Sequence, residues 1–268
     1  RHDHRAATGY GPEMTDELVH LEIDAGIATI TLDSPANRNA LSTQLRRELR
    51  AHLGTAIESD LARVIVLTHT GTVFCAGMDL KESRGASASE QGVTDFPDML
   101  QRIWDSPTPV IAKLAGPARA GGVGLVAACD LAVAAEPVTF AFSEVRIGVV
   151  PAVISVPLIP RVQPAALYQL FLTGESFDAR RAAEIGLITS AVPADAVDAE
   201  VQRFADMLRL GAPGALAATK ELLRGPASAT MADDLATMTT LSAARFASEE
   251  GQEGIRAFLE KRKPSWAV

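Results

Sequence analysis

The hydrophobic and polar residues in the first half of the chain alternate with a short period, and this pattern predicts strands. Residues 20–32 alternate on both sides of a turn at Asp24, Ala25 and Gly26, which predicts a hairpin. Apolar runs too short for helices predict buried strands, and they lie at residues 64–69, 110–115, 131–135 and 139–142.

Helices are predicted between these strands by apolar residues at helical spacing. Ser42 is a favourable N-cap for a helix that runs to about Ser59. Further helices are expected at 96–104 and 123–129, and the polar, glycine-containing segment 83–94 predicts a mobile loop. Because strands and helices alternate up to residue 142, we expect an α/β fold with a largely parallel sheet.

The pattern changes to helices from about Val162, apart from a short strand expected at 188–192. The predicted helices cover residues 164–172, 179–185, 196–210, 213–224, 232–247 and 249–261. We expect this helical tail to pack against the core or against a neighbouring subunit. The resulting division is a flexible leader (1–13), a core (14–200) and a C-terminal helical region (201–268).

Composition places the chain among soluble globular proteins. It has 268 residues, of which 47% are hydrophobic and 22% charged, and a net charge of −8. No long basic run is present, which disfavours nucleic acids and membrane surfaces as partners. Cys75 and Cys129 are too few for a disulfide framework, and the leader lacks the apolar core of a signal peptide, so we expect a cytoplasmic protein.

Several common catalytic signatures are missing from the sequence. It has no phosphate-binding P-loop, no early Gly-x-Gly-x-x-Gly turn and no Gly-x-Ser-x-Gly elbow. The five histidines are scattered, and no metal site is expected from their spacing. Cys75 has no nearby histidine that could activate it, and we interpret it as a packing residue.

Two glycine turns follow predicted strands, one at Gly77 and Met78 and the other at Gly121 and Gly122. Neighbouring parallel strands would bring both turns to the same edge of the sheet, where ligands bind in open α/β sheets. One backbone N–H group from each turn could then bind a single carbonyl oxygen. The alternative is that the second turn is an ordinary connection between a strand and a helix.

Glu144 is a carboxylate surrounded in sequence by apolar residues. Burial disfavours its charged form and raises its pKa toward values that are useful for acid/base catalysis. The alternative is a paired or exposed carboxylate at the end of a strand.

Taken together, seven segments of the chain resemble the enoyl-CoA hydratase/isomerase (crotonase) superfamily. They are residues 37–41, 71–80, 109–130, 142–151, 172–175, 182–187 and 258–264. The resemblance implies an α/β fold, a crotonase-like spiral of ββα units with a C-terminal helical trimerisation region, in a homotrimer or hexamer. It also implies that the N–H groups of Met78 and Gly121 bind the thioester oxygen of an acyl-CoA. No cofactor is implied beyond coenzyme A as part of the substrate.

The same resemblance implies a set of substrate-binding residues. Lys261 or Lys263 could reach the CoA phosphates, and Arg119 either faces a substrate carboxylate or is a surface or subunit-contact residue. The other matching positions are Ala36, Arg38, Ala40, Ala76, Asp79, Leu80, Gly122 and Gly124.

The chain departs from the resemblance at one catalytic position. Well-known hydratases of the family use two glutamates; Glu144 matches one of them, and Gly124 stands at the other. The leading hypothesis is an acyl-CoA lyase of fatty acid metabolism that adds water across a 2-enoyl-CoA with Glu144 alone. The alternatives are an enoyl-CoA isomerase, a methylglutaconyl-type CoA hydratase and a catalytically silent acyl-CoA-binding protein.

Overall fold

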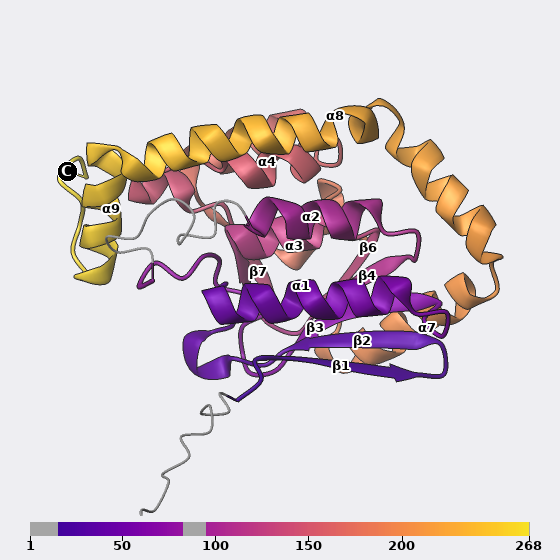
Figure 1. The fold of residues 1–268 in the computed structure, drawn as a ribbon. Coiled ribbons are helices and arrows are strands. Elements are labelled where there is room, and N and C mark those ends of the chain that lie inside the picture. Colours follow the sequence, from indigo (N-terminus) through magenta and orange to yellow (C-terminus); the bar gives the residue numbers. More distant parts are fainter. Residues whose placement is uncertain (1–15, 83–94, 268) are drawn as a thin grey trace, which may run out of the picture.

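The protein has two sheets at its centre, with helices packed around them (Figure 1). We analysed a computed structural model, which describes residues 16–82 and 95–267. The larger sheet has the order β1-β2-β3-β4-β6-β9, in which the β1–β2 pair is antiparallel and all other pairs are parallel. Its strands are β1 (Val19–Asp24), β2 (Ile27–Leu32), β3 (Val64–His69), β4 (Val110–Leu114), β6 (Leu131–Ala135) and β9 (Ser190–Val192).

The smaller sheet explains the spiral course of the chain. Its strands, in the order β5-β7-β8, are β5 (Ala118–Arg119), β7 (Thr139–Ala141) and β8 (Ser176–Asp178), and a parallel bridge joins Cys75 to Ala118. Successive turns of the chain therefore pass from the large sheet to the small sheet and then to a helix. This arrangement confirms the predicted α/β fold and its ββα spiral.

The helices surround this centre. They are α1 (Thr43–Glu58), α2 (Asp95–Asp105), α3 (Gly121–Ala128), α4 (Ala152–Leu158), α5 (Pro164–Thr173), α6 (Ala179–Glu184), α7 (Val197–Arg209), α8 (Pro213–Ala247) and α9 (Glu249–Leu259). Short 3-10 helices lie at η1 (Pro35–Asn37), η2 (Glu144–Ile147) and η3 (Ala194–Ala196). None of the helices in the described ranges combines the length and the apolar content that a membrane crossing needs.

Helix α1 shows how the sequence pattern becomes structure. The Ser42 hydroxyl accepts a hydrogen bond from the Leu45 nitrogen at 3.3 Å, which caps the helix as predicted. Leu45, Leu49 and Leu53 then recur at intervals of four residues and are fully buried. This apolar face packs the helix on β1 and β2.

The structure differs from the sequence-based prediction at several elements. Helix α3 begins at Gly121, two residues before the predicted start, and β8 and α4 were not predicted. Pro157 inside α4 and the three-residue length of β8 hide both elements from periodicity. Helix α7 crosses the expected domain boundary at residue 200 and packs on β4 and β6, so it lies against the core. The predicted loop at 83–94 lies outside the described residues.

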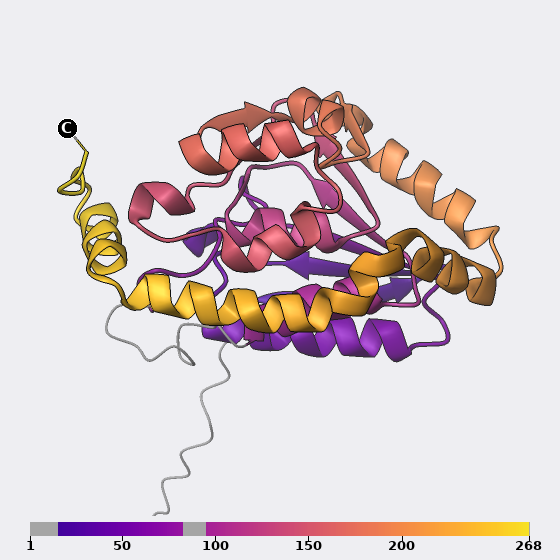
Figure 2. The same cartoon turned by 90° about the horizontal axis from the view of Figure 1, so that it is seen from above.

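Helix α8 is bent and returns across the molecule. Gly225 has φ +49° and ψ −134°, which separates two helical halves. Lys220 in the first half donates to an Asp130 carboxylate oxygen at 2.6 Å and to the Thr108 carbonyl at 3.0 Å. Figures 1 and 2 show the second half running across α2 and α4 and ending at α9. The C-terminal segment thereby reaches the side of the molecule where the loop after β3 and the start of α3 lie.

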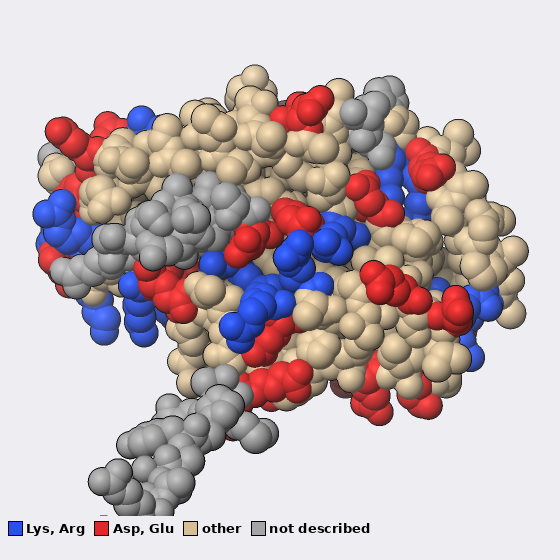
Figure 3. Space-filling model, in the orientation of Figure 1, with Lys and Arg blue, Asp and Glu red and all other residues tan. Residues whose placement is uncertain are grey.

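Charged residues of both signs are mixed on the face shown in Figure 3. The basic group over α1 and α2 includes Arg50 and Arg102, whose Nε atoms lie 2.6 and 2.8 Å from the same Asp98 oxygen. The two guanidinium groups share this one carboxylate, so their charge is partly compensated.

Candidate active site

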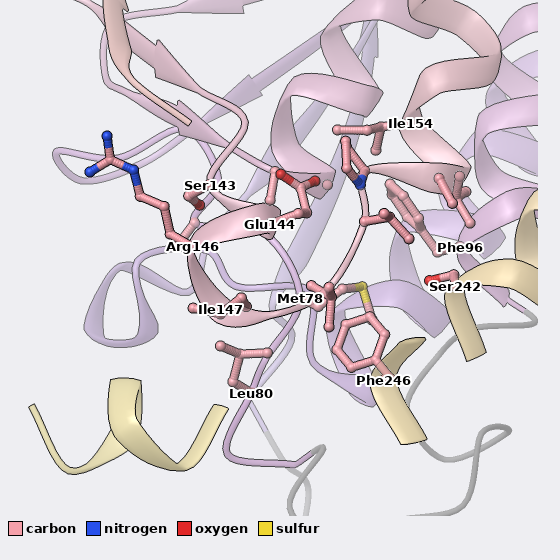
Figure 4. A pocket seen from close by; sticks show the side chains of 18 of the residues that line it. Met78, Leu80, Phe96, Ser143, Glu144, Arg146, Ile147, Ile154, Ser242 and Phe246 are labelled. Atoms are coloured by element: carbon pink, nitrogen blue, oxygen red, sulfur yellow. The ribbon is translucent and has the colours of Figure 1, made fainter. Parts of the chain in front are cut away.

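A cavity of about 270 Å³ lies where several parts of the chain meet (Figure 4). These parts are the loop after β3, the start of α2, the start of α3, the segment from η2 to α4, and the ends of α8 and α9. The lining side chains that the structure describes are mostly apolar, and Glu144 is the one carboxylate among them. The lining residues are Ala76, Met78, Leu80, Phe96, Pro97, Ala120, Gly121, Ser143, Glu144, Arg146, Ile147, Val149, Val150, Pro151, Ala152, Val153, Ile154, Ser242, Phe246 and Phe258.

The two glycine turns meet on one wall of this cavity. Gly77 has φ +90°, and a Cβ atom there would lie 3.2 Å from the Arg119 carbonyl oxygen and 3.5 Å from the Gly121 nitrogen. Only glycine combines this backbone conformation with so close an approach. Met78, the next residue, is thereby held beside Gly121, and both line the cavity.

The N–H groups of Met78 and Gly121 have no hydrogen-bond partner within the described ranges. Gly121 is the first residue of α3, where helical N–H groups lack partners and the helix dipole is positive. The preceding residue, Ala120, has φ +46° and ψ −117°, a conformation that L-residues rarely adopt. Two unpaired donors on one cavity wall form an arrangement that can bind an oxygen carrying negative charge.

Gly122 has a packing role that explains the position of the second turn. A Cβ atom on Gly122 would lie 2.6 Å from the Cys75 carbonyl oxygen and 2.8 Å from the Cys75 Cβ. Cys75 is fully buried, and burial raises the pKa of its thiol to about 12. A thiol with so high a pKa is a poor nucleophile, which agrees with Cys75 being a packing residue.

Glu144 lies on another wall, at the start of η2 directly after β7. Its side chain is buried with 9% of the residue exposed, and its Oε2 has no hydrogen-bond partner among the described residues. Burial raises the pKa of this carboxyl group to about 7. A carboxyl group with a pKa near neutrality can accept a proton in one step and return it in the next.

The space beside Gly124 is filled by apolar side chains. A Cβ atom there would lie 2.6 Å from Ile154 Cγ2 and 3.3 Å from Phe96 Cζ. Gly124 itself is not among the lining residues, whereas Ile154 and Phe96 are. The position that matches the second glutamate of family hydratases is therefore covered by an apolar wall.

The residues expected to bind CoA lie on two adjacent segments. The Ala76 nitrogen donates to the Arg38 carbonyl at 3.1 Å, and the Asn37 side-chain amide donates to Asp79 at 2.8 Å. These bonds hold the loop that contains Ala36, Arg38 and Ala40 against the turn at 76–80. Among the candidates on these two segments, Ala76 and Leu80 also line the cavity beside Met78, whereas Ala36, Arg38, Ala40 and Asp79 lie outside it.

Arg119 and Lys261 lie outside the cavity. The Arg119 guanidinium donates to the Thr139 carbonyl at 2.6 Å and to the Thr139 hydroxyl at 2.8 Å. Its side chain is held by β7 because β5 and β7 are paired at this point. Lys261 is exposed just after α9, three residues beyond Phe258, which lines the cavity.

The sequence did not identify the walls that come from distant helices. Phe96 on α2 and Phe246 on α8 belong to amphipathic patterns that indicate burial but not what the buried face contacts. Pro151, just before α4, and Ile154, within it, also line the cavity. No group of three metal-ligating side chains is found in the described part of the chain.

Comparison with known proteins identifies the family of this fold and site. The family model described as enoyl-CoA hydratase/isomerase matches residues 22–268. The chain belongs to the enoyl-CoA hydratase/isomerase family. This match confirms the predicted family and the prediction that the protein is an enzyme of the enoyl-CoA hydratase type.

Three relatives illustrate the range of this family. The chain is 34% identical to enoyl-CoA hydratase domain-containing protein 3, mitochondrial, of Rattus norvegicus, over 96% of this chain and 87% of that protein. The crystal structure of an enoyl-CoA hydratase from Mycobacterium avium is 42% identical, with a TM-score of 0.85, covering 94% of this chain and 100% of the other. A methylmalonyl-CoA decarboxylase structure is 27% identical, with a TM-score of 0.80, covering 94% and 99%.

Proposed function

We propose that this enzyme adds water across the double bond of a 2-enoyl-CoA. The observation that carries the proposal is that two unpaired N–H groups and one buried carboxyl group line the same cavity. An acyl-CoA thioester needs both features. Its carbonyl oxygen becomes negatively charged during addition, and a proton must move to the carbon chain.

In the proposed reaction, the thioester oxygen accepts hydrogen bonds from the Met78 and Gly121 nitrogens. These donors stabilise the enolate that forms when the water oxygen bonds to C3. The Glu144 carboxylate takes a proton from that water and then returns it to C2. Each backbone donor contributes about 3 kcal/mol to the barrier reduction, by analogy with other oxyanion sites.

The remaining contacts belong to the CoA part of the substrate. We assign this role to the two adjoining segments that contain Ala36, Arg38 and Ala40 on one side and Asp79 and Leu80 on the other. Lys261 is the proposed partner for a CoA phosphate. A homotrimer or hexamer, fatty acid metabolism and a cytoplasmic location also remain predictions; the rat relative is named as mitochondrial.

The direct test is turnover of crotonyl-CoA and of longer and branched 2-enoyl-CoAs. Hydration removes the conjugated double bond and its ultraviolet absorbance, and the 3-hydroxyacyl-CoA product is identified by mass spectrometry. We expect loss of absorbance with at least one of these substrates. Acyl-CoA binding in calorimetry with no product across the panel would instead identify a catalytically silent binding protein.

A second candidate function, isomerisation of a 3-enoyl-CoA to a 2-enoyl-CoA, is favoured by the apolar wall at Gly124. Ile154 and Phe96 fill the place of a second carboxylate, and one base is sufficient to move a proton between C2 and C4. Turnover of a 3-enoyl-CoA without turnover of any 2-enoyl-CoA would identify this activity. The methylglutaconyl-type alternative remains a prediction, and Arg119, whose guanidinium donates to Thr139, lies outside the cavity.

A further inference from the structure

The buried face of α8 carries one polar residue where it reaches the cavity. After the bend at Gly225, Met231 and Leu235 are buried with 2% exposed, and Ser242 follows on the same face with 8% exposed. The intervals of four and seven residues correspond to about one and two turns of a helix, so the three side chains lie on one face. An apolar residue would satisfy the packing at this position, so the serine needs another explanation.

The Ser242 hydroxyl differs from the other hydroxyls of the same helix. The hydroxyls of Thr219, Thr239 and Thr240 each donate to the carbonyl four residues earlier, at 2.7, 2.7 and 3.2 Å respectively. Ser242 makes no such bond, and no hydrogen bond engages its hydroxyl anywhere in the described ranges. The Ser242 Oγ does not belong to the fully buried side-chain atoms that lack a partner, and the residue lines the cavity, so its free hydroxyl is open to the cavity and can bind a ligand atom there.

The surroundings of Ser242 are apolar. Figure 4 shows Ser242 apart from Glu144 and on the same helix as Phe246, and both line the cavity together with Phe96. Ligand cavities are typically apolar with a few placed polar groups, and those groups fix the orientation of the ligand and its specificity. Ser242 is placed to act on a part of the acyl group that Glu144 does not reach.

The charges around the cavity limit what Ser242 can recognise. Arg146 is the one cationic residue among the described lining residues, and its Nε donates to the Thr173 carbonyl at 3.1 Å. Figure 4 shows its guanidinium group directed away from Glu144 and from the other labelled side chains of the cavity. A carboxylate on the acyl group would therefore find no free charged partner among the described lining side chains, which is costly. An uncharged oxygen has no such cost.

We propose that Ser242 is a specificity residue whose hydroxyl binds an uncharged oxygen on the acyl group of the substrate. The preferred substrate class is then an acyl-CoA that carries a hydroxyl or keto group away from the thioester. The hydroxyl of Ser242 can both donate and accept, so it pairs with either group. This inference rests on the proposed function in one respect only, namely that the ligand is an acyl-CoA.

The test measures binding rather than turnover, so that it does not depend on the reaction. Calorimetry with the full chain compares butanoyl-, hexanoyl- and octanoyl-CoA with the same thioesters carrying a terminal hydroxyl group. These saturated compounds cannot be hydrated. For at least one chain length, we expect the hydroxylated thioester to bind roughly 3- to 10-fold more tightly, the usual effect of one hydrogen bond.

Two variants separate a specific contact from a general effect on α8. Ser242→Ala is expected to remove the preference while leaving the affinity for the plain thioesters unchanged. Thr240→Ala removes an exposed hydroxyl from the same helix and is expected to keep the preference. Equal affinity for plain and hydroxylated thioesters at every length, or a preference that persists in Ser242→Ala, would overturn the proposal. If no enoyl-CoA is turned over but the binding preference is present, the proposed reaction fails and the role of Ser242 stands.

Discussion

Ile154 occupies the space into which a side chain at Gly124 would extend: a Cβ atom on Gly124 would lie only 2.6 Å from Ile154 Cγ2. This separation is well inside the optimal distance of about 3.5–4.0 Å between carbon atoms. The glycine therefore does more than omit a carboxylate. It allows α3 and α4 to approach, and that approach supplies an apolar wall opposite Glu144.

The contact leads to a prediction about restoring the second glutamate. We expect Gly124→Glu to lower the free energy of unfolding by about 3 kcal/mol, because the side chain overpacks the contact and buries a carboxyl group. Ile154→Ala alone is expected to cost about 2–4 kcal/mol through the cavity that it leaves. The stability lost in the double variant should be smaller than the sum of the two single losses by about 1–3 kcal/mol, as measured by denaturant unfolding. Strict additivity would show that the two positions do not compete for space.

Glu144→Gln tests the proposed proton transfer. Glutamine keeps the size of the side chain but cannot take a proton from water, so we expect turnover of a 2-enoyl-CoA to fall by roughly 100-fold or more. Binding of a saturated acyl-CoA should change little, because the N–H groups of Met78 and Gly121 are retained. Steady-state kinetics and calorimetry measure the two quantities separately. Turnover at the wild-type rate would remove Glu144 from the mechanism.

Glu144→Gln also tests how far the Glu144 carboxyl group lowers the stability of the folded protein. Burial raises the pKa of Glu144 from 4.5 to about 7, so between these values the folded state binds more protons than the unfolded state. The contribution of Glu144 to the free energy of unfolding is therefore greatest below pH 4.5 and decreases as the pH rises to about 7. Above that pH the loss levels off at about 3 kcal/mol.

Glu144→Gln does not titrate, so it should lack this decrease. We expect the variant to gain stability relative to the wild type by about 3 kcal/mol between about pH 5 and about pH 8. Denaturant unfolding of both proteins at several pH values measures this difference. Parallel pH profiles would mean that Glu144 titrates normally in the folded protein.

The sequence predicts most elements of the fold because local signals and tertiary packing agree there. The Ser42 cap, the leucines of α1 and the Ala25–Gly26 turn each reflect interactions within a few residues. The prediction was less accurate where distant contacts decide the structure. Helix α3 starts at Gly121, where Gly122 packs closely on Cys75, and no local pattern reports that contact.

The same distinction between local signals and distant contacts applies to the candidate site. The glycine turns and Glu144 can be found in the sequence because unusual residue types mark them. Phe246 and Ser242 could not be assigned to the cavity, because their positions depend on how α8 packs across α2 and α4. Arg119 was expected in the turn beside the glycines, whereas it lies in the short strand β5, whose pairing with β7 directs its guanidinium to Thr139.

Gly77→Ala tests whether the approach of the two turns matters for catalysis. The methyl group would lie 3.1 Å from Ala120 Cβ and 3.2 Å from the Arg119 carbonyl oxygen, in a backbone conformation with φ +90° that alanine rarely adopts. The turns must separate slightly, and small displacements of catalytic groups can lower rates by about 100-fold. We expect kcat to fall by roughly 10- to 100-fold, and stability to fall by about 1–3 kcal/mol.

Gly54→Ala is the matched control, because a Cβ atom there meets no other atom within 4 Å and lies on the surface of α1. That variant should keep wild-type kcat and gain up to about 1 kcal/mol in stability, since alanine favours the helix. Equal kcat values for the two variants would show that oxyanion stabilisation does not depend on the close approach at Gly77.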